Sequence, residues 1–294
     1  MLLLLLPALL LASVPGTAAP VSVPIGHFQT WLPSSRAPMA FTSGGVSVEV
    51  APLPCPAHPQ GDGDCRWEGY NNQAQVTVRA GGVTPLSVTT DPQSGYARIA
   101  VVRFRRSDPR PGVIVESQSG GSGGDLSVQF LVPSGTGYRV LPLGQTPAHP
   151  LQGQIADEPH DLSGDGFLDL TLRDGAFDSA FGCNACTPRP PRVFAVENGR
   201  VVDESRDPAL RPVFAADMAL LEPHCLSKET YRNGTCAAYV ADAARAGRFR
   251  SAWVKMLAHY ERGRDIWQPD KGPRFRSFPE SLRAFLIRAG YLPT

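Results

Sequence analysis

The chain has 294 residues, six cysteines and a formal net charge of +1. Once the leader described below is removed, about 276 residues remain, enough for one large domain or two ordinary ones. The sequence contains no Walker loop, dinucleotide fingerprint or aromatic-basic nucleic-acid motif, which excludes those classes of binding protein.

Charge and turn residues divide the chain into two parts. Glycine and proline, 29 of each, predict many turns and hence a β-rich body. Residues 1–227 carry 15 Lys/Arg against 21 Asp/Glu, whereas residues 228–294 carry 13 against 6. The basic C-terminal part is typical of a solvated helical face, and it also suits an anionic surface as a partner.

The N-terminus reads as a cleavable signal peptide over residues 1–18. Residues 2–14 are apolar apart from Ser13, a length that suits an export leader and is too short for a membrane span. Small residues at Gly16 and Ala18 place the cleavage after Ala18, although no Lys or Arg precedes the apolar run. We therefore expect a periplasmic or extracellular protein with no membrane span after cleavage.

Short strands are predicted from about residue 45 to residue 205, within a β-rich domain over 19–210. Two hairpins stand out, because each joins two strand-like runs through turn residues. The first joins 126–132 to 138–143 through a five-residue loop at 133–137. The second joins 193–197 to 201–203 through Asn198-Gly199, which favours a type I′ turn.

A helical subdomain is predicted over 225–294. The expected helices cover 236–246 with Thr235 as the cap, 249 to about 263, and 277–290 with a capping box between Ser277 and Glu280. In the middle helix an apolar stripe recurs at helical spacing, which predicts core packing rather than a ligand groove. The stripe consists of Phe249, Ala252, Trp253, Met256, Leu257 and Tyr260.

The six cysteines of an exported chain favour disulfides. Short loop spacing suggests the pairs Cys55–Cys65, Cys183–Cys186 and Cys225–Cys236. Alternatives for Cys183-Asn-Ala-Cys186 are a redox pair or half of a zinc site completed by His224 and Cys225.

The loop Asp161 to Asp169 has the pattern of a calcium site. Gly166 lets the backbone turn sharply, and oxygen ligands recur at alternate loop positions, as calcium requires. The predicted ligands are Asp161, Ser163, Asp165, the Phe167 carbonyl and Asp169. Leu172 stands where an EF-hand has its Glu, and residues 167–172 read as strand, so the loop is not an EF-hand.

This loop resembles the FG-GAP or VCBS-type repeat of integrin-like β-propellers, over residues 157–205 and in a single copy. It is also similar to uncharacterised exported bacterial proteins that carry one such loop ahead of a helical tail. The resemblance implies calcium binding in propeller-blade-like sheets. We therefore predict an α+β fold and a calcium-binding protein with a non-catalytic binding or structural role.

One catalytic alternative is a secreted hydrolase. Gly120-Gly-Ser122-Gly-Gly124 fits the Gly-x-Ser-x-Gly pattern, with Ser122 as the nucleophile and His160, His224 or His259 as the base. Strand-like residues follow it, whereas a nucleophile elbow needs a helix there. The partner is unknown, and an anionic envelope polymer or another protein are the candidates.

Overall fold

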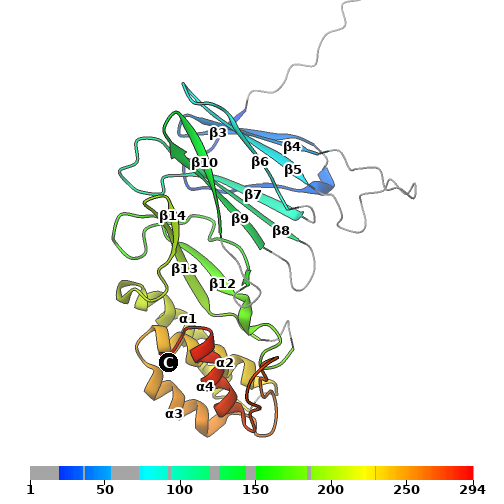
Figure 1. The fold of residues 1–294 in the computed structure, drawn as a ribbon, viewed down its shortest axis with the longest axis vertical. Coiled ribbons are helices and arrows are strands. Elements are labelled where there is room, and N and C mark those ends of the chain that lie inside the picture. Colours follow the sequence, from blue (N-terminus) through cyan, green and yellow to red (C-terminus); the bar gives the residue numbers. More distant parts are fainter. Residues whose placement is uncertain are drawn as a thin grey trace, which may run out of the picture.

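A computed structural model describes residues 20–35, 37–53, 73–91, 94–119, 126–143, 150–183, 187–228 and 230–293. The molecule is elongated, with two stacked sheets at one end, a smaller sheet in the middle and the helices at the other end (Figure 1). The predicted α+β class, β-rich with a helical C-terminal part, is confirmed. The predicted leader and Ser122 lie outside the described residues.

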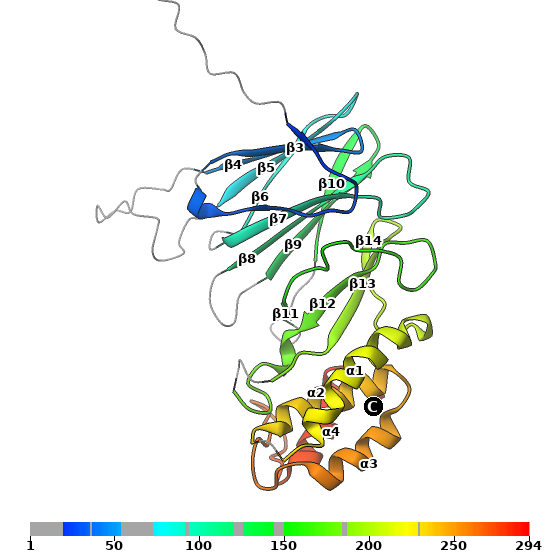
Figure 2. The same ribbon diagram turned by 180° about the vertical axis from the view of Figure 1, so that it is seen from behind.

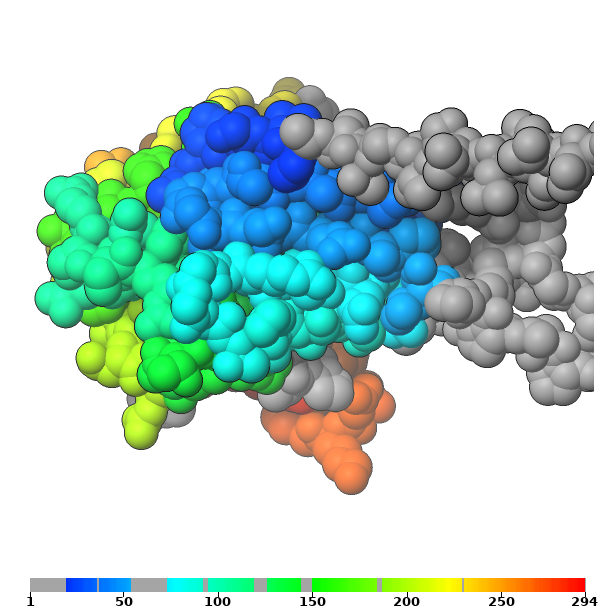
Figure 3. All heavy atoms as spheres, turned by 90° about the horizontal axis from the view of Figure 1, so that it is seen from above, coloured from blue at the N-terminus to red at the C-terminus, as the bar shows by residue number. Residues whose placement is uncertain are grey.

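The first sheet has five strands in the order β1-β3-β4-β5-β6 and forms the outer surface at the top of the molecule (Figure 3). In β4 the alternate residues Val46, Val48 and Val50 are buried, which is the period-2 pattern of a strand with one solvent face. The strands are β1 Val21–Ser22, β3 Met39–Ser43, β4 Val46–Pro52, β5 Ala74–Ala80 and β6 Leu86–Thr89.

The second sheet has five strands in the order β10-β9-β8-β7-β2. Its strands are β2 Gln29–Trp31, β7 Ser94–Val102, β8 Gly112–Ser119, β9 Leu126–Ser134 and β10 Gly137–Pro142, and a 3-10 turn at Pro33–Ser35 follows β2. The predicted hairpin β9–β10 is present, but its predicted five-residue loop is wrong. Pairing continues to Ser134 and Gly137, which leaves a two-residue turn.

The two five-stranded sheets stack face to face, as Figure 2 also shows. One apolar cluster fills the space between them, with Val48 and Val76 from the first sheet packed beside Ile99 and Val113 from the second. The other face of the second sheet carries a separate cluster that includes Ile114. Both faces of the second sheet are therefore buried, which explains why β7 and β8 read as continuous apolar runs.

The third sheet is a four-stranded antiparallel meander that packs on that second face. Its strands are β11 Leu151–Gln152, β12 Leu170–Asp174, β13 Pro191–Glu197 and β14 Arg200–Asp203, with 3-10 turns at Gly175–Phe177 and Pro208–Leu210. The hairpin β13–β14 turns at Asn198 and Gly199, whose φ angles are 46° and 72°. These left-handed values confirm the turn chemistry predicted from Asn-Gly.

Four helices close the other end: α1 Arg211–Cys225, α2 Arg232–Arg245, α3 Phe249–His259 and α4 Phe278–Arg288. Their shared core also takes Phe177 and Phe181 from the segment after β12. The ring of Phe285 lies edge-on to both, with centroid distances of 4.9 and 5.1 Å. Aromatic packing of this kind joins the helices to the third sheet. Within the described residues, no helix has the length and apolar character needed to cross a membrane.

Three details of the predicted helices are wrong. The predicted cap Thr235 lies inside α2, which begins at Arg232 after Tyr231 in a left-handed conformation. Glu280 accepts a hydrogen bond from the Arg276 N–H, at 3.1 Å, and the Ser277 side chain makes no capping bond. Leu257, predicted as core, is 41% exposed.

The rest of the α3 stripe packs as predicted. Ala252 and Met256 are buried, and Phe249, Trp253 and Tyr260 pack against the same core while partly exposed. The helix ends at His259. Its fully buried residues, Ala252 and Met256, form a narrow stripe, and Leu257 lies outside that stripe.

The disulfide Cys225–Cys236 is present and joins the end of α1 to α2. It removes Cys225 as a zinc ligand, so the zinc alternative built on that residue fails. Cys183 is also disulfide-bonded. Cys55, Cys65 and Cys186 lie outside the described residues, so the two other predicted pairings stay predictions.

Candidate metal centre

The predicted calcium loop is held at both ends by backbone pairing. Asp169 pairs with His160 across the base of the loop, and Phe167 pairs with Arg105 of the second-sheet region. Gly164 and Gly166 have φ angles of +84° and +91°, a region that strongly favours glycine. The loop is therefore fixed in position by its sequence and by the neighbouring strand.

Asp161 shapes the loop from within. Its Oδ1 accepts hydrogen bonds from the N–H groups of Gly164 and Asp165, at 2.6 and 3.1 Å, and its Oδ2 accepts one from Gly166 at 2.9 Å. The Arg106 guanidinium lies 3.8 Å from the same oxygen. This predicted ligand thus uses its carboxylate mainly to satisfy loop N–H groups.

Asp169 is almost fully buried, at 1% exposure. Its Oδ2 accepts hydrogen bonds from the N–H groups of Leu162 and Ser163, at 2.5 and 2.8 Å. Among the residues that the structure describes, its Oδ1 has no hydrogen-bond partner, and neither has the buried hydroxyl of Ser163. An unpaired buried carboxylate oxygen is costly, since about 1–3 kcal/mol or more is lost when such a group has no partner.

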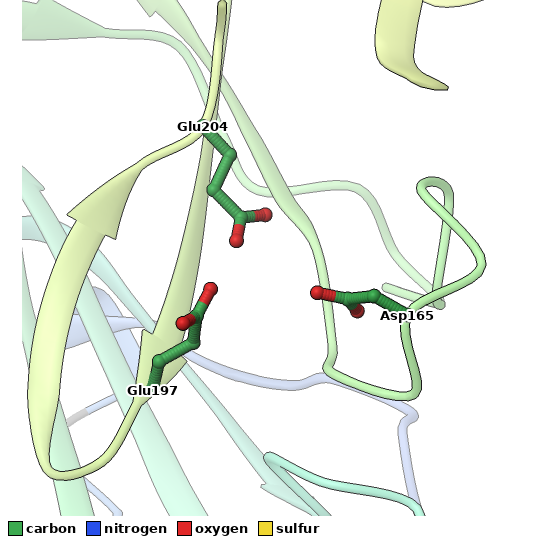
Figure 4. Close-up of side chains that lie close together, drawn as sticks. All are labelled: Asp165, Glu197 and Glu204. Atoms are coloured by element: carbon green, nitrogen blue, oxygen red, sulfur yellow. The ribbon is translucent and has the colours of Figure 1, made fainter. Parts of the chain in front are cut away.

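Asp165 meets two carboxylates that the sequence analysis did not identify. The carboxylate oxygens of Asp165, Glu197 and Glu204 lie within 4.8 Å of one another. Figure 4 shows the three side chains pointing toward a common space, from the loop, from the end of β13 and from just beyond β14. Asp165 is exposed and also accepts a hydrogen bond from the Phe167 N–H at 2.8 Å, whereas the two glutamates are half-buried.

The hairpin register explains why the two glutamates meet. Glu197 pairs with Arg200 across the hairpin. The Glu204 N–H donates a hydrogen bond to the carbonyl of Val193, which lies four residues before Glu197 on β13. Side chains alternate between the faces of a strand, so Glu197 and Glu204 project from the same face. The Asn-Gly turn fixes this register, so the turn is the sequence signal that could have shown that Glu197 and Glu204 lie on one face.

The electrostatics of the cluster are unfavourable for four free carboxylates. Burial, with the neighbouring Glu197 and Asp169 carboxyl groups, raises the pKa of Glu204 to about 9. Glu204 also has a buried oxygen, Oε2, without a hydrogen-bond partner. A carboxyl group with such a pKa holds its proton near neutral pH, so the acidic cluster, defined as Asp165, Asp169, Glu197 and Glu204, does not carry all four negative charges unless a cation neutralises them.

The cluster fits a hard divalent cation. Calcium takes several oxygen ligands, largely carboxylates, and the unpartnered oxygens of Asp169 and Glu204 are of that kind. Of the predicted ligands, Asp165 lies with the two glutamates in this space, and the Asp169 carboxyl group interacts with that of Glu204. The Phe167 carbonyl stays a predicted ligand, and the ring of that residue lies under the Arg105 guanidinium, 5.2 Å from the ring centroid to the guanidinium carbon.

The histidines proposed for the hydrolase alternative have other contacts. His160 Nδ1 lies 3.1 Å from the Glu158 carbonyl, and His259 Nδ1 lies 2.8 Å from the Lys255 carbonyl. His224 is exposed near the end of α1. The alternative rests on Ser122, which lies outside the described residues, so it stays a prediction.

Fold and cluster together define an α+β protein in which a small sheet gathers carboxylates beside the loop at residues 161–169. Residues 214–290, which cover most of the helical part, match the sll0997 C-terminal domain family. The chain is 27% identical over 239 residues to the probable thylakoid lumen protein sll0997 of Synechocystis, an alignment that covers 76% of this chain. It is 23% identical over 291 residues to the uncharacterized protein y4bJ of Sinorhizobium fredii, covering 90% of this chain.

The relatives are longer proteins. This chain spans 66% of the length of the first and 42% of the second. No solved structure matches the chain.

Proposed function

We propose that this chain is an exported, non-catalytic protein that binds calcium at its acidic cluster. The ligands are Asp165, Asp169, Glu197 and Glu204. The observation that carries the proposal is the Oδ1 atom of Asp169, which is buried without a hydrogen-bond partner next to the Glu204 carboxyl group. A bound cation would neutralise these groups and tie the loop to the hairpin β13–β14.

Three observations support export. The leader at residues 1–18 is one, and the disulfide Cys225–Cys236 is a second, because such bonds persist in oxidising compartments. The third is the relative named as a probable thylakoid lumen protein. Periplasmic or extracellular work in binding or structure, on an anionic polymer or another protein, is the role we propose.

The proposed ligand set differs from the loop motif in one respect. The FG-GAP-like pattern uses the first Asp of the loop, whereas Asp161 here holds the loop N–H groups. Glu197 and Glu204 supply carboxylates in its place. Asp165 and Asp169 belong to both sets, so Asp161 and Glu204 are the residues that distinguish them.

Calcium should raise the melting temperature, because an ion that binds only the folded state stabilises it in proportion to RT ln(1 + [L]/Kd). Differential scanning calorimetry with and without millimolar calcium measures this shift. We expect Asp165→Ala and Glu204→Gln to abolish it. Without calcium, Glu204→Gln should be at least as stable as the wild type, because it removes one acid from a repelling group.

The matched control is Glu49→Gln, a glutamate on the first sheet that pairs with Arg79 far from the cluster. It should retain the full calcium shift. A wild-type melting temperature that does not respond to calcium would refute the proposal. A shift that survives Glu204→Gln would return the site to the loop residues alone.

A further inference from the structure

A second charged site lies where the hairpin β13–β14 meets the ends of α2 and α4. A cavity of about 370 Å³ opens there. It is lined by four arginines, Arg192, Arg206, Arg245 and Arg288, and by one carboxylate, Asp203. We call these four residues the arginine cluster. A neighbouring cavity of about 300 Å³ shares Arg206, Arg245 and Gly290 and adds Arg211.

Within the part of the chain that the structure describes, one guanidinium of the cluster is paired with an acid. Arg192 donates to Asp203 at 2.6 Å, and Arg206 donates to the Gly290 carbonyl at 3.0 Å. Among the described residues, Arg245 and Arg288 make no hydrogen bond or ion pair. The Nε of Arg245 is buried without any partner.

The rings near these arginines position them but do not neutralise them. The Arg245 guanidinium lies 4.7 Å from the Tyr291 ring centroid, and that of Arg288 lies 5.7 Å from the Trp267 ring centroid. Such contacts hold a guanidinium in place and leave its N–H donors free at the edge. Both groups are thus oriented in advance of any ligand.

Helix dipoles compensate for part of this charge and no more. Arg245 ends α2 and Arg288 ends α4, and each helix C-terminus carries roughly half a negative charge. With Asp203, and with Asp174, whose carboxylate also acts on Arg192, this amounts to about three negative charges against four guanidinium groups. Burial lowers the pKa of Arg245, and Arg206 and Arg192 lower it further, against the opposing effect of Tyr291 and Asp203.

We propose that the arginine cluster binds a phosphate group. Planar guanidinium forks match oxyanions through paired hydrogen bonds, and several forks around one cavity suit a tetrahedral dianion better than a single carboxylate. The volume accommodates a phosphate with a small substituent. The site is separate from the acidic cluster and does not depend on calcium.

Isothermal titration calorimetry with inorganic phosphate tests this, in calcium-free buffer with ionic strength held constant by chloride. We expect saturable binding with one phosphate per chain. Arg288→Gln and Arg206→Gln should each raise the Kd by about tenfold or more, the usual cost of losing a charge-assisted hydrogen bond. Arg245→Lys keeps the charge but loses the fork, and it should also weaken binding.

The matched control is Arg283→Gln, which removes an exposed arginine from the same helix as Arg288 outside the cavity. It should leave the Kd unchanged. Glycerol phosphate in a parallel titration distinguishes the sources: binding of both probes indicates a substituted phosphate, and binding of inorganic phosphate alone indicates the free ion. Absence of saturable binding, or an equal loss from Arg283→Gln, would overturn the proposal.

Discussion

The hairpin β13–β14 contributes residues to both charged sites, from opposite faces of its strands. Glu197 and Glu204 project from one face and meet Asp165 of the loop, whereas Arg192 and Asp203 lie on the other face and line the arginine-rich cavity. The alternation of side chains along a strand places both sets on one short hairpin without bringing them into contact. A single turn at Asn198-Gly199 therefore sets the register of two sites of opposite charge.

The two sites differ in how far apart their residues lie along the sequence. The acidic cluster combines a nine-residue loop with a hairpin close to it in the chain, and part of it is evident in the sequence. The arginine cluster joins residues from β13 to the end of α4, nearly a hundred positions apart. Local motifs are predictable because their geometry is set within a few residues, and the arginine cluster exists only after the helices pack.

The largest effect is expected at the turn shared by both sites. Gly199 has a φ of +72°, and a Cβ there would clash with the Arg139 guanidinium. Gly199→Val should lower the free energy of unfolding by about 1–3 kcal/mol, the usual cost of a strained backbone. Chemical denaturation measures this loss, and calorimetry should show weaker calcium and phosphate responses together.

Gly135→Val is the matched control for that change. Gly135 also occupies a hairpin turn with positive φ, at +54°, in β9–β10, and a Cβ there meets no atom within 4 Å. Similar strain should lower stability and leave both ligand responses intact. Equal loss of both responses in the two variants would show that general destabilisation, rather than hairpin register, is responsible.

An intermediate effect is expected at Asp242, a buried acid of α2 away from the acidic cluster. Both of its carboxylate oxygens have no hydrogen-bond partner, and burial with nearby Asp217 raises its pKa well above the usual value, while Arg173 opposes this. The folded state therefore keeps a proton that the unfolded state loses above about pH 3.9. Stability must fall as the pH rises from there toward the folded-state pKa.

Asp242→Asn removes that dependence. Its stability relative to the wild type should grow with pH, at no more than about 1.4 kcal/mol per pH unit. Urea denaturation at pH 4.5 and at pH 7.5 measures the difference, and the calcium shift should stay unchanged. A difference in stability that does not vary with pH would mean that Asp242 is ionised in the folded protein.

The smallest effect is expected at the surface pair of Glu49 and Arg79, whose side chains are 50% and 51% exposed. Glu49→Gln should change the free energy of unfolding by about 0–1 kcal/mol, because water and salt screen such pairs. Denaturant titrations at low and high salt measure it. A larger cost, or one that depends on calcium, would show that surface acids in general produce the calcium response.

Much of the fold could be predicted from the sequence where short segments determine the geometry. Asn198-Gly199 specified its hairpin, and Cys225 and Cys236 were paired from spacing alone. The sequence does not readily predict α1, because Pro212 and Pro223 disfavour a helix interior. Pro212, however, lies in the first turn of α1, where proline is tolerated. Its buried Phe214, Met218 and Cys225 do recur at helical spacing.

Glu204 was missed for a different reason. Its place beside Asp169 depends on the pairing of β12 with β13, which joins segments separated by a long connection. A pattern within one strand cannot specify that contact. The same holds for Arg245 and Arg288, which the sequence shows only as part of a basic tail.

The disulfide Cys225–Cys236 fixes an order of events during maturation. Both cysteines have no exposed surface in the folded protein, and thiol–disulfide exchange requires access to sulfur. Oxidation must therefore precede the closure of the helices over this pair. A chain that folded first in a reducing compartment would keep two shielded thiols, and delivery to an oxidising one afterwards would not restore the bond until the helices reopened.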